Sequence, residues 1–165
     1  MRTKEARIRT ALAAYTRSPW GRATRQQTHA KGLCKRASLV ALELLHREGV
    51  DAARLWHLGA PKDGSPFAPS DEHYVVVVGD EAIDVTHRQF DPSCEAITRR
   101  PLREVSQPWH AAQPVCIGQT DPMIGTDLHA IPANWRELAE AVPPGDAIGW
   151  PYPGPWPAEN PQPKE

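Results

Sequence analysis

Two β-rich runs separated by two turn residues constrain the fold more than any other feature of this sequence. The run HYVVVV at 73–78 is followed by Gly79 and Asp80, and then by EAIDVT at 81–86. β-Branched residues favour strands, and a Gly-Asp pair suits the tight turn of a hairpin. The sequence therefore predicts an antiparallel hairpin that turns at the Gly-Asp pair.

The length of this turn also predicts which side chains share a face of the hairpin. With two residues in the turn, Val78 faces Glu81, and counting outward puts His73 and Asp84 on one side in a diagonal relation. Diagonal neighbours have Cβ atoms within about 7 Å, so an imidazole N–H can reach a carboxylate. A three-residue turn would reverse the parity and separate the two groups. By the same parity, we expect His87 on the far face from Asp84.

Apolar residues at helical spacing predict two helices. Residues 33–48 have an apolar stripe on one side and charged residues on the other, and Gly49 follows as a stop signal. Residues 4–16 predict a shorter amphipathic helix that packs on the core. The stretch 18–32 has no period and is expected to be a loop.

The other expected elements have weaker patterns. Residues 52–58 predict a strand, and three prolines with two glycines predict a mobile surface loop at 59–70. A further strand is expected at 115–118 and a short helix at 134–142.

Length and composition favour a single domain of the α+β class. A chain of 165 residues, 40% hydrophobic and 24% charged, can bury one core. Eight prolines fall between Pro143 and Pro163, alternating with aromatic residues and glycine, which favours an extended polyproline-like conformation. We therefore expect one domain over residues 1–142 and an extended tail over 143–165.

Charge and cysteine usage limit the partners and the compartment. The chain has 19 basic and 20 acidic residues, so neither nucleic acid nor an anionic membrane is an expected partner. The N-terminus lacks the apolar stretch of a secretory signal, and no later segment is long enough to span a bilayer. Three cysteines at wide spacings indicate free thiols in a reducing compartment. We expect a cytoplasmic protein in the producing cell.

Cys34 is the candidate nucleophile. It opens the predicted helix, where the positive end of the helix dipole and a nearby imidazole would favour the thiolate, and its own N–H could help to hold an oxyanion. A lone cysteine is usually a small buried hydrophobic residue, and a histidine that begins a strand is usually structural. The chain order of Cys34, then His73, then Asp84 favours a catalytic triad instead. A metal site is not expected, because no C-x-x-C pair or close histidine spacing is present.

Three segments carry a resemblance to a known group of proteins. GLC at 32–34, EHYVVVV at 72–78 and EAIDVTHRQFD at 81–91 resemble the papain-like fold of bacterial papain-fold toxins, protein-glutamine deamidases and transglutaminase-like enzymes. The run DVTHRQF at 84–90 is similar to the D-x-T-x-x-Q-F pattern of toxin and deamidase domains. The resemblance implies a central helix carrying the cysteine, packed on an antiparallel sheet that carries the histidine and the aspartate.

The resemblance favours deamidation of glutamine in a protein substrate, with no cofactor. A cysteine peptidase, a transglutaminase and a catalytically inactive binding module on the same scaffold remain alternatives. Gln27 is a candidate for an oxyanion donor, and Trp56 is a candidate for substrate binding. The resemblance to toxins also implies an immunity or delivery partner and delivery into a target cell by a secretion system.

Overall fold

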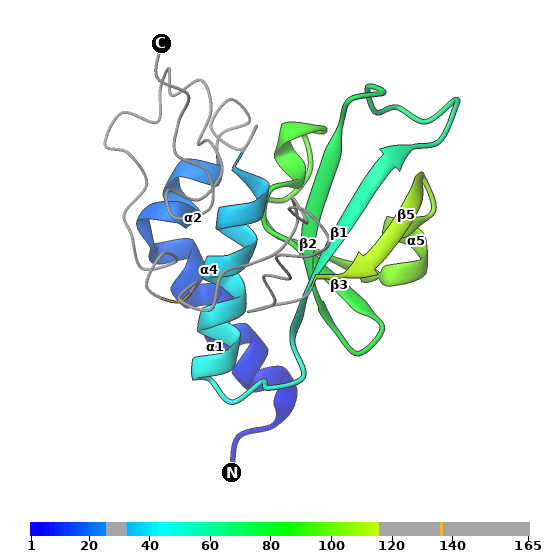
Figure 1. Cartoon of the computed structure of the whole chain (residues 1–165). Helices are drawn as coiled ribbons and strands as arrows, with labels where there is room; N and C mark the ends of the chain where they lie inside the picture. Colours follow the sequence, from blue (N-terminus) through cyan, green and yellow to red (C-terminus); the bar gives the residue numbers. More distant parts are fainter. Residues whose placement is uncertain (26–32, 116–135, 137–165) are drawn as a thin grey trace, which may run out of the picture.

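The computed structural model describes residues 1–25, 33–115 and 136 and has the expected α+β class (Figure 1). The helices are α1 (Lys4–Arg17), α2 (Pro19–Thr24), α4 (Cys34–Arg47) and α5 (Leu102–Ser106), and a short 3-10 helix, η1, spans His87–Gln89. The strands are β1 (Arg54–Pro61), β2 (Glu72–Val78), β3 (Glu81–Asp84), β4 (Thr98–Pro101) and β5 (Trp109–Pro114).

The five strands form one antiparallel sheet in the order β4-β3-β2-β1-β5. The hairpin of β2 and β3 has the predicted two-residue turn, because Val78 pairs with Glu81 and Val77 with Ala82. Gly79 has a φ of 64°, a left-handed conformation that glycine adopts at little cost. The hairpin and its register are therefore confirmed.

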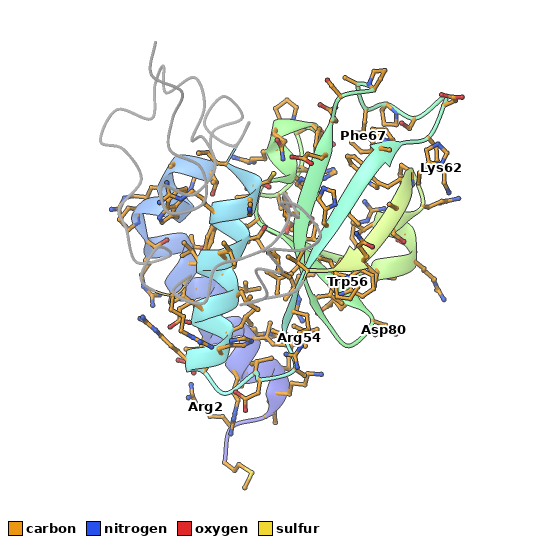
Figure 2. All side chains as sticks on the ribbon, viewed as in Figure 1. Arg2, Arg54, Trp56, Lys62, Phe67 and Asp80 are labelled. Carbon is orange, nitrogen blue, oxygen red and sulfur yellow. The ribbon has the colours of Figure 1, made fainter. Side chains whose placement is uncertain are left out.

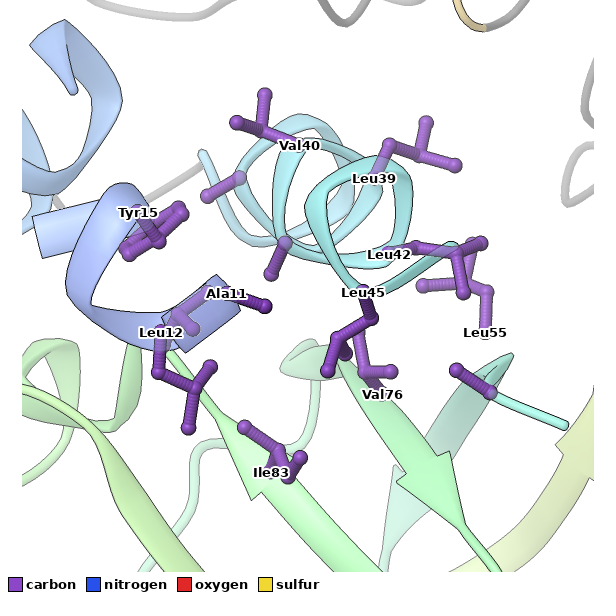
Figure 3. Close-up of a cluster of buried hydrophobic side chains, with 14 of the residues drawn as sticks. Ala11, Leu12, Tyr15, Leu39, Val40, Leu42, Leu45, Leu55, Val76 and Ile83 are labelled. Carbon is purple, nitrogen blue, oxygen red and sulfur yellow. The ribbon is translucent and has the colours of Figure 1, made fainter. Parts of the chain in front are cut away.

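Helices α1, α2 and α4 lie together on one side of the sheet (Figure 1). The apolar stripe of α4 faces the sheet, as its helical spacing predicts, and α1 packs against α4. Gly49 follows α4 with a φ of 82°, which confirms it as the stop. Figure 3 shows the resulting core, which includes Leu12, Tyr15, Leu39, Leu42, Leu45, Leu55, Val76 and Ile83.

The opposite face of the sheet has a thinner cover. Its buried cluster consists of Leu58, Val75, Val77, Ala82 and Trp109. Partly buried side chains of α5 and of two loops pack over this cluster, among them Phe67, Phe90, Leu102 and Val105. This second face carries His73 and Asp84, because both residues have the parity of Val75 and Ala82 along their strands.

The expectation of a loop over 18–32 is wrong for its first part, since α2 occupies Pro19–Thr24. Ser18 caps this helix by accepting a hydrogen bond from the Gly21 N–H at 3.0 Å, and Pro19 stands in the first turn, where its missing donor costs nothing. The helix is tied back to α1 by a 2.7 Å hydrogen bond between the hydroxyls of Tyr15 and Thr24.

Four other expected elements are shifted or lie partly or wholly outside the described residues. The strand expected at 52–58 is shifted to β1, and β4, α5 and β5 were not expected. Of the strand expected at 115–118, only Val115 is described, and it donates its N–H to Leu55 O at 2.9 Å. The helix expected at 134–142, apart from Arg136, and the tail expected at 143–165 lie outside the described residues. Within the described part of the chain, none of the helices is long and apolar enough to cross a membrane.

Candidate active site

Cys34 is the first residue of α4 and is 8% exposed. Leu33 occupies the N-cap position, and its side chain makes no capping hydrogen bond. The first N–H groups of a helix have no partner within the helix, and they concentrate partial positive charge there. The thiol therefore lies at the positive end of the helix dipole, as the sequence predicts.

His73 and Asp84 form a buried pair on neighbouring strands. The imidazole Nε2 donates to Asp84 Oδ2 at 2.7 Å, and the two residues are 2% and 1% exposed. The pairs that join β2 to β3 end at Val76 and Ile83, so the imidazole and the carboxylate meet beyond the last of them. This contact is the diagonal relation predicted from the length of the turn.

The thiol of Cys34 lies within hydrogen-bonding range of the same imidazole. Burial opposes protonation of His73, but the charges and hydrogen bonds of Asp84 and Cys34 prevail and raise its pKa to about 10. Burial likewise opposes ionisation of Asp84, yet its contacts with His73, His87 and the Thr86 N–H hold the pKa of the carboxyl well below its usual range. The structure thus brings Cys34, His73 and Asp84 together around a protonated imidazole.

Gln89 is a fourth polar side chain at this site, and it was not among the expected site residues. Its amide Nε2 lies 3.0 Å from His73 Nδ1 and 3.4 Å from Thr86 Oγ1. An amide NH2 only donates, so this contact is a hydrogen bond in the neutral imidazole, whose Nδ1 accepts, and not in the imidazolium that the raised pKa of His73 favours. Because Nε2 of the imidazole is already bonded to Asp84, the Gln89 amide approaches the other nitrogen. The sequence signal that could have indicated a role for Gln89 is the glutamine of the D-x-T-x-x-Q-F pattern.

The expectation that His87 lies on the far face from Asp84 is wrong. Its Nδ1 is 3.3 Å from Asp84 Oδ2, the same oxygen that accepts from His73. Strand parity fails here because β3 ends at Asp84, and Thr86, with φ −133° and ψ 16°, turns the chain into η1. The side chain of His87 therefore folds back toward the carboxylate.

Aromatic side chains surround the imidazole of His73 on the second face of the sheet. Phe90 meets it edge-on at 5.0 Å between ring centroids, and Trp109 lies parallel to it at 6.3 Å. Phe67 stacks on Trp109 at 4.6 Å, although it belongs to the segment expected to be a mobile loop. A cavity of about 70 Å³ lies among these rings, His73, Asp84 and His87.

Trp56, the candidate for substrate binding, does not lie beside Cys34, His73 and Asp84. Trp56 is half-buried on β1 opposite Val75, and it lines a separate cavity of about 630 Å³ with Arg100 and Leu102. Figure 2 shows Trp56 toward the Asp80 turn, at the other end of the sheet from Phe67. Gln27 lies outside the described residues.

Cys94 gives an internal comparison for Cys34. It is a free thiol of intermediate exposure, and its Sγ contacts Glu95 O at 3.2 Å. Burial and the charges of Asp91 and Asp84 raise the pKa of this thiol. Cys116 lies outside the described residues. Cys94 is therefore the more exposed thiol, in a setting that disfavours the thiolate.

No protein-family model matches this chain, and neither a curated protein nor a solved structure matches it. Any function proposed for the chain therefore rests on its own residues and on the geometry of its site.

Proposed function

We propose that this protein is a cysteine-dependent acyl-transfer enzyme that deamidates glutamine in a protein substrate. The observation that carries the proposal is the 2.7 Å contact between His73 and Asp84, both buried, with the Cys34 thiol in range of the same imidazole. A structural histidine needs no buried carboxylate and no thiol at a helix start beside it. A catalytic cysteine needs both groups: the imidazole helps to form the thiolate, and the carboxylate orients the imidazole as proton donor.

In the first half of the proposed reaction, the Cys34 thiolate attacks the carbonyl carbon of the carboxamide. The tetrahedral intermediate collapses when the C–N bond breaks and the His73 imidazolium gives its Nδ1 proton to the departing nitrogen, which leaves as ammonia. A thioester then links the substrate to Cys34. Asp84 stays ionised and holds the imidazole through Nε2.

In the second half, water attacks the thioester carbon. His73, now neutral, takes a proton from the water, and the C–S bond breaks to return the Cys34 thiolate. The products are a glutamate side chain and ammonia. Had a lysine amine attacked the thioester instead of water, the product would be an isopeptide crosslink.

Two N–H donors are candidates for holding the oxyanion of the intermediate. The backbone N–H of Cys34 lies at the start of α4, where an N–H has no partner within the helix. The Gln89 amide lies on the Nδ1 side of the imidazole, which is the side left for the thiol because Nε2 is bonded to Asp84. Donors fixed beside developing negative charge lower the barrier, because they need no reorganisation during the reaction.

The choice of a glutamine carboxamide rests on the resemblance of residues 84–90 to the pattern of deamidase domains. The crosslinking and peptidase alternatives use the same three residues, so the products distinguish them. Incubation with glutamine-rich proteins should release ammonia and convert individual glutamines to glutamate, as read by peptide mass spectrometry.

A matched pair of variants tests this proposal. Cys34→Ala should abolish ammonia release, while Cys94→Ala should keep it, because Cys94 has no contact with His73 among its described interactions. Peptide cleavage without ammonia would identify a peptidase, and crosslinks in the presence of amines would identify a transglutaminase. Equal activity in Cys34→Ala and the unmodified protein would contradict the triad itself.

A further inference from the structure

The carboxylate of Asp84 is held by three donors from three residues. Its Oδ1 accepts from the Thr86 N–H at 2.9 Å, and its Oδ2 lies 2.7 Å from His73 Nε2 and 3.3 Å from His87 Nδ1. A Cys-His-Asp triad requires only the second of these contacts. The third contact, from His87, has no place in the mechanism proposed above.

His87 differs from the other two donors in its exposure. Its side chain is 24% exposed, whereas His73 is 2% exposed and Thr86 is fully buried. It lines the cavity of about 70 Å³ beside the carboxylate, and Phe90 packs against its ring at 6.0 Å. His87 therefore stands between the buried Asp84 and the surface.

The charged groups around His87 come from several elements. Asp84 contacts it from β3, and Asp91 faces it from the turn after η1. Arg100 of β4 and Glu104 of α5 line the same cavity. Of these groups, Asp84 is the one that lies within hydrogen-bonding distance of the His87 ring, at 3.3 Å.

We propose that His87 is a positioning residue of the triad, whose Nδ1–H holds Asp84 Oδ2 against His73 Nε2. This inference rests on the proposed function and deepens it. The Thr86 N–H fixes one oxygen of the carboxylate, but the carboxylate can still tilt about that contact. A second donor on Oδ2, from the surface side, prevents the tilt and keeps water in the cavity from competing with His73 for that oxygen.

The consequence reaches the thiol through His73. A well-oriented carboxylate favours the imidazolium, and the imidazolium favours the Cys34 thiolate. Without the His87 donor, the carboxylate binds His73 less tightly and less thiolate is present near neutral pH. At high pH the thiol ionises without help from the imidazole, so the loss should disappear there.

Isosteric variants separate this role from simple packing. In His87→Asn, the amide nitrogen takes the place of Nδ1 and can still donate to Asp84. His87→Leu fills a similar volume with no donor. His110→Asn changes an exposed histidine of β5 and serves as the surface control.

The experiment measures alkylation of Cys34 by iodoacetamide at pH 6 and pH 9, together with the downfield proton resonance of His73 Nε2–H. His87→Leu should react about 10-fold more slowly at pH 6, as expected for one lost hydrogen bond to a charged group, and should match the unmodified protein at pH 9. Its Nε2–H resonance should shift. His87→Asn should restore both values, and His110→Asn should change neither.

Two results for His87→Leu would overturn the inference, and one result for the unmodified protein would overturn the proposed function. If Cys34 reacts fast in the unmodified protein and His87→Leu matches it at pH 6 with an unshifted resonance, the positioning role of His87 is wrong and the triad stands. A His87→Leu rate that is equally low at pH 6 and pH 9 indicates a packing defect and also overturns the inference. If Cys34 of the unmodified protein reacts no faster than Cys94, the proposed function fails first.

Discussion

Replacing Asp84 by asparagine tests the buried pair while keeping its shape. The carboxylate offers an acceptor to each of two donors, since Oδ1 accepts from the Thr86 N–H at 2.9 Å and Oδ2 accepts from His73 Nε2 at 2.7 Å. An amide has one acceptor oxygen and one NH2 group. Whichever way the introduced amide turns, either Thr86 or His73 faces a donor instead of an acceptor.

The expected loss follows from the strength of the contact. A hydrogen bond to a charged group contributes about 1.5–3 kcal/mol, and one pKa unit corresponds to about 1.4 kcal/mol. Asp84→Asn should therefore lower the pKa of His73, which is about 10 in the folded protein, by roughly one to two units. The equilibrium constant for forming the imidazolium–thiolate pair from the neutral pair falls by the same factor, so the loss of Cys34 alkylation rate near neutral pH should reach at most about 10- to 100-fold.

The assay is the alkylation rate of Cys34 between about pH 5 and pH 9, a range that includes the ordinary pKa of a thiol, about 8.5, and the upper part of the range of activated thiols. Urea unfolding of the same variant is the control, because a loss of rate counts only where the protein is folded. Asp84→Asn that stays folded and keeps the rate of the unmodified protein at every pH would refute the reasoning, since the carboxylate would then contribute nothing to the thiolate.

Three further predictions follow from the same structure. Gln89→Leu should lower the turnover of the folded protein at least about 10-fold, because it removes one donor beside the reacting atoms. The pKa of His73 is raised in the folded protein, so protonation of His73 stabilises the fold fully below about pH 6.5 and no longer does so above about pH 10. The urea midpoint of the unmodified protein should therefore fall between these pH values. The fall should be smaller in Asp84→Asn. Gly21→Ala should lower the free energy of unfolding by about 1–3 kcal/mol, because the added Cβ would clash with Tyr15 O and lie 2.8 Å from Thr16 Cα; an unchanged urea midpoint would contradict this.

The elements that could be predicted from the sequence are those with local, repeated signals. The two-residue turn at Gly79 set the register of the hairpin, and this register placed His73 beside Asp84. The apolar stripe and the glycine stop likewise predicted α4 to within a residue or two of its ends. In both cases, one short pattern determines the geometry of many residues.

The missed strands lack any such pattern. β4 has the sequence TRRP, and β5 is exposed along most of its length, so neither shows the alternation of a half-buried strand. Both are edge strands of the sheet, and their pairing partners, rather than their own side chains, place them. The six residues of α2 are too few to show a helical period, although the Ser18 and Pro19 pair is a helix-start signal.

The site was predicted in part for the same reason. Cys34, His73 and Asp84 lie within regular elements, and their directions follow from helix position and strand parity. His87 and Gln89 lie in η1, beyond the end of β3, where parity no longer applies. The direction of their side chains depends on how the chain turns at Thr86. Strand alternation does not predict that turn.

The most direct test of the triad compares two thiols in one protein. Iodoacetamide labelling near neutral pH, followed by peptide mass spectrometry, measures the rates at Cys34 and Cys94 together, in the unmodified protein and in His73→Ala. Cys34 should label faster although it is the more buried thiol, and its advantage should disappear in His73→Ala. If Cys94 labels as fast as Cys34, or if His73→Ala leaves the rate at Cys34 unchanged, the imidazole does not activate the thiol and the proposed enzyme activity is contradicted.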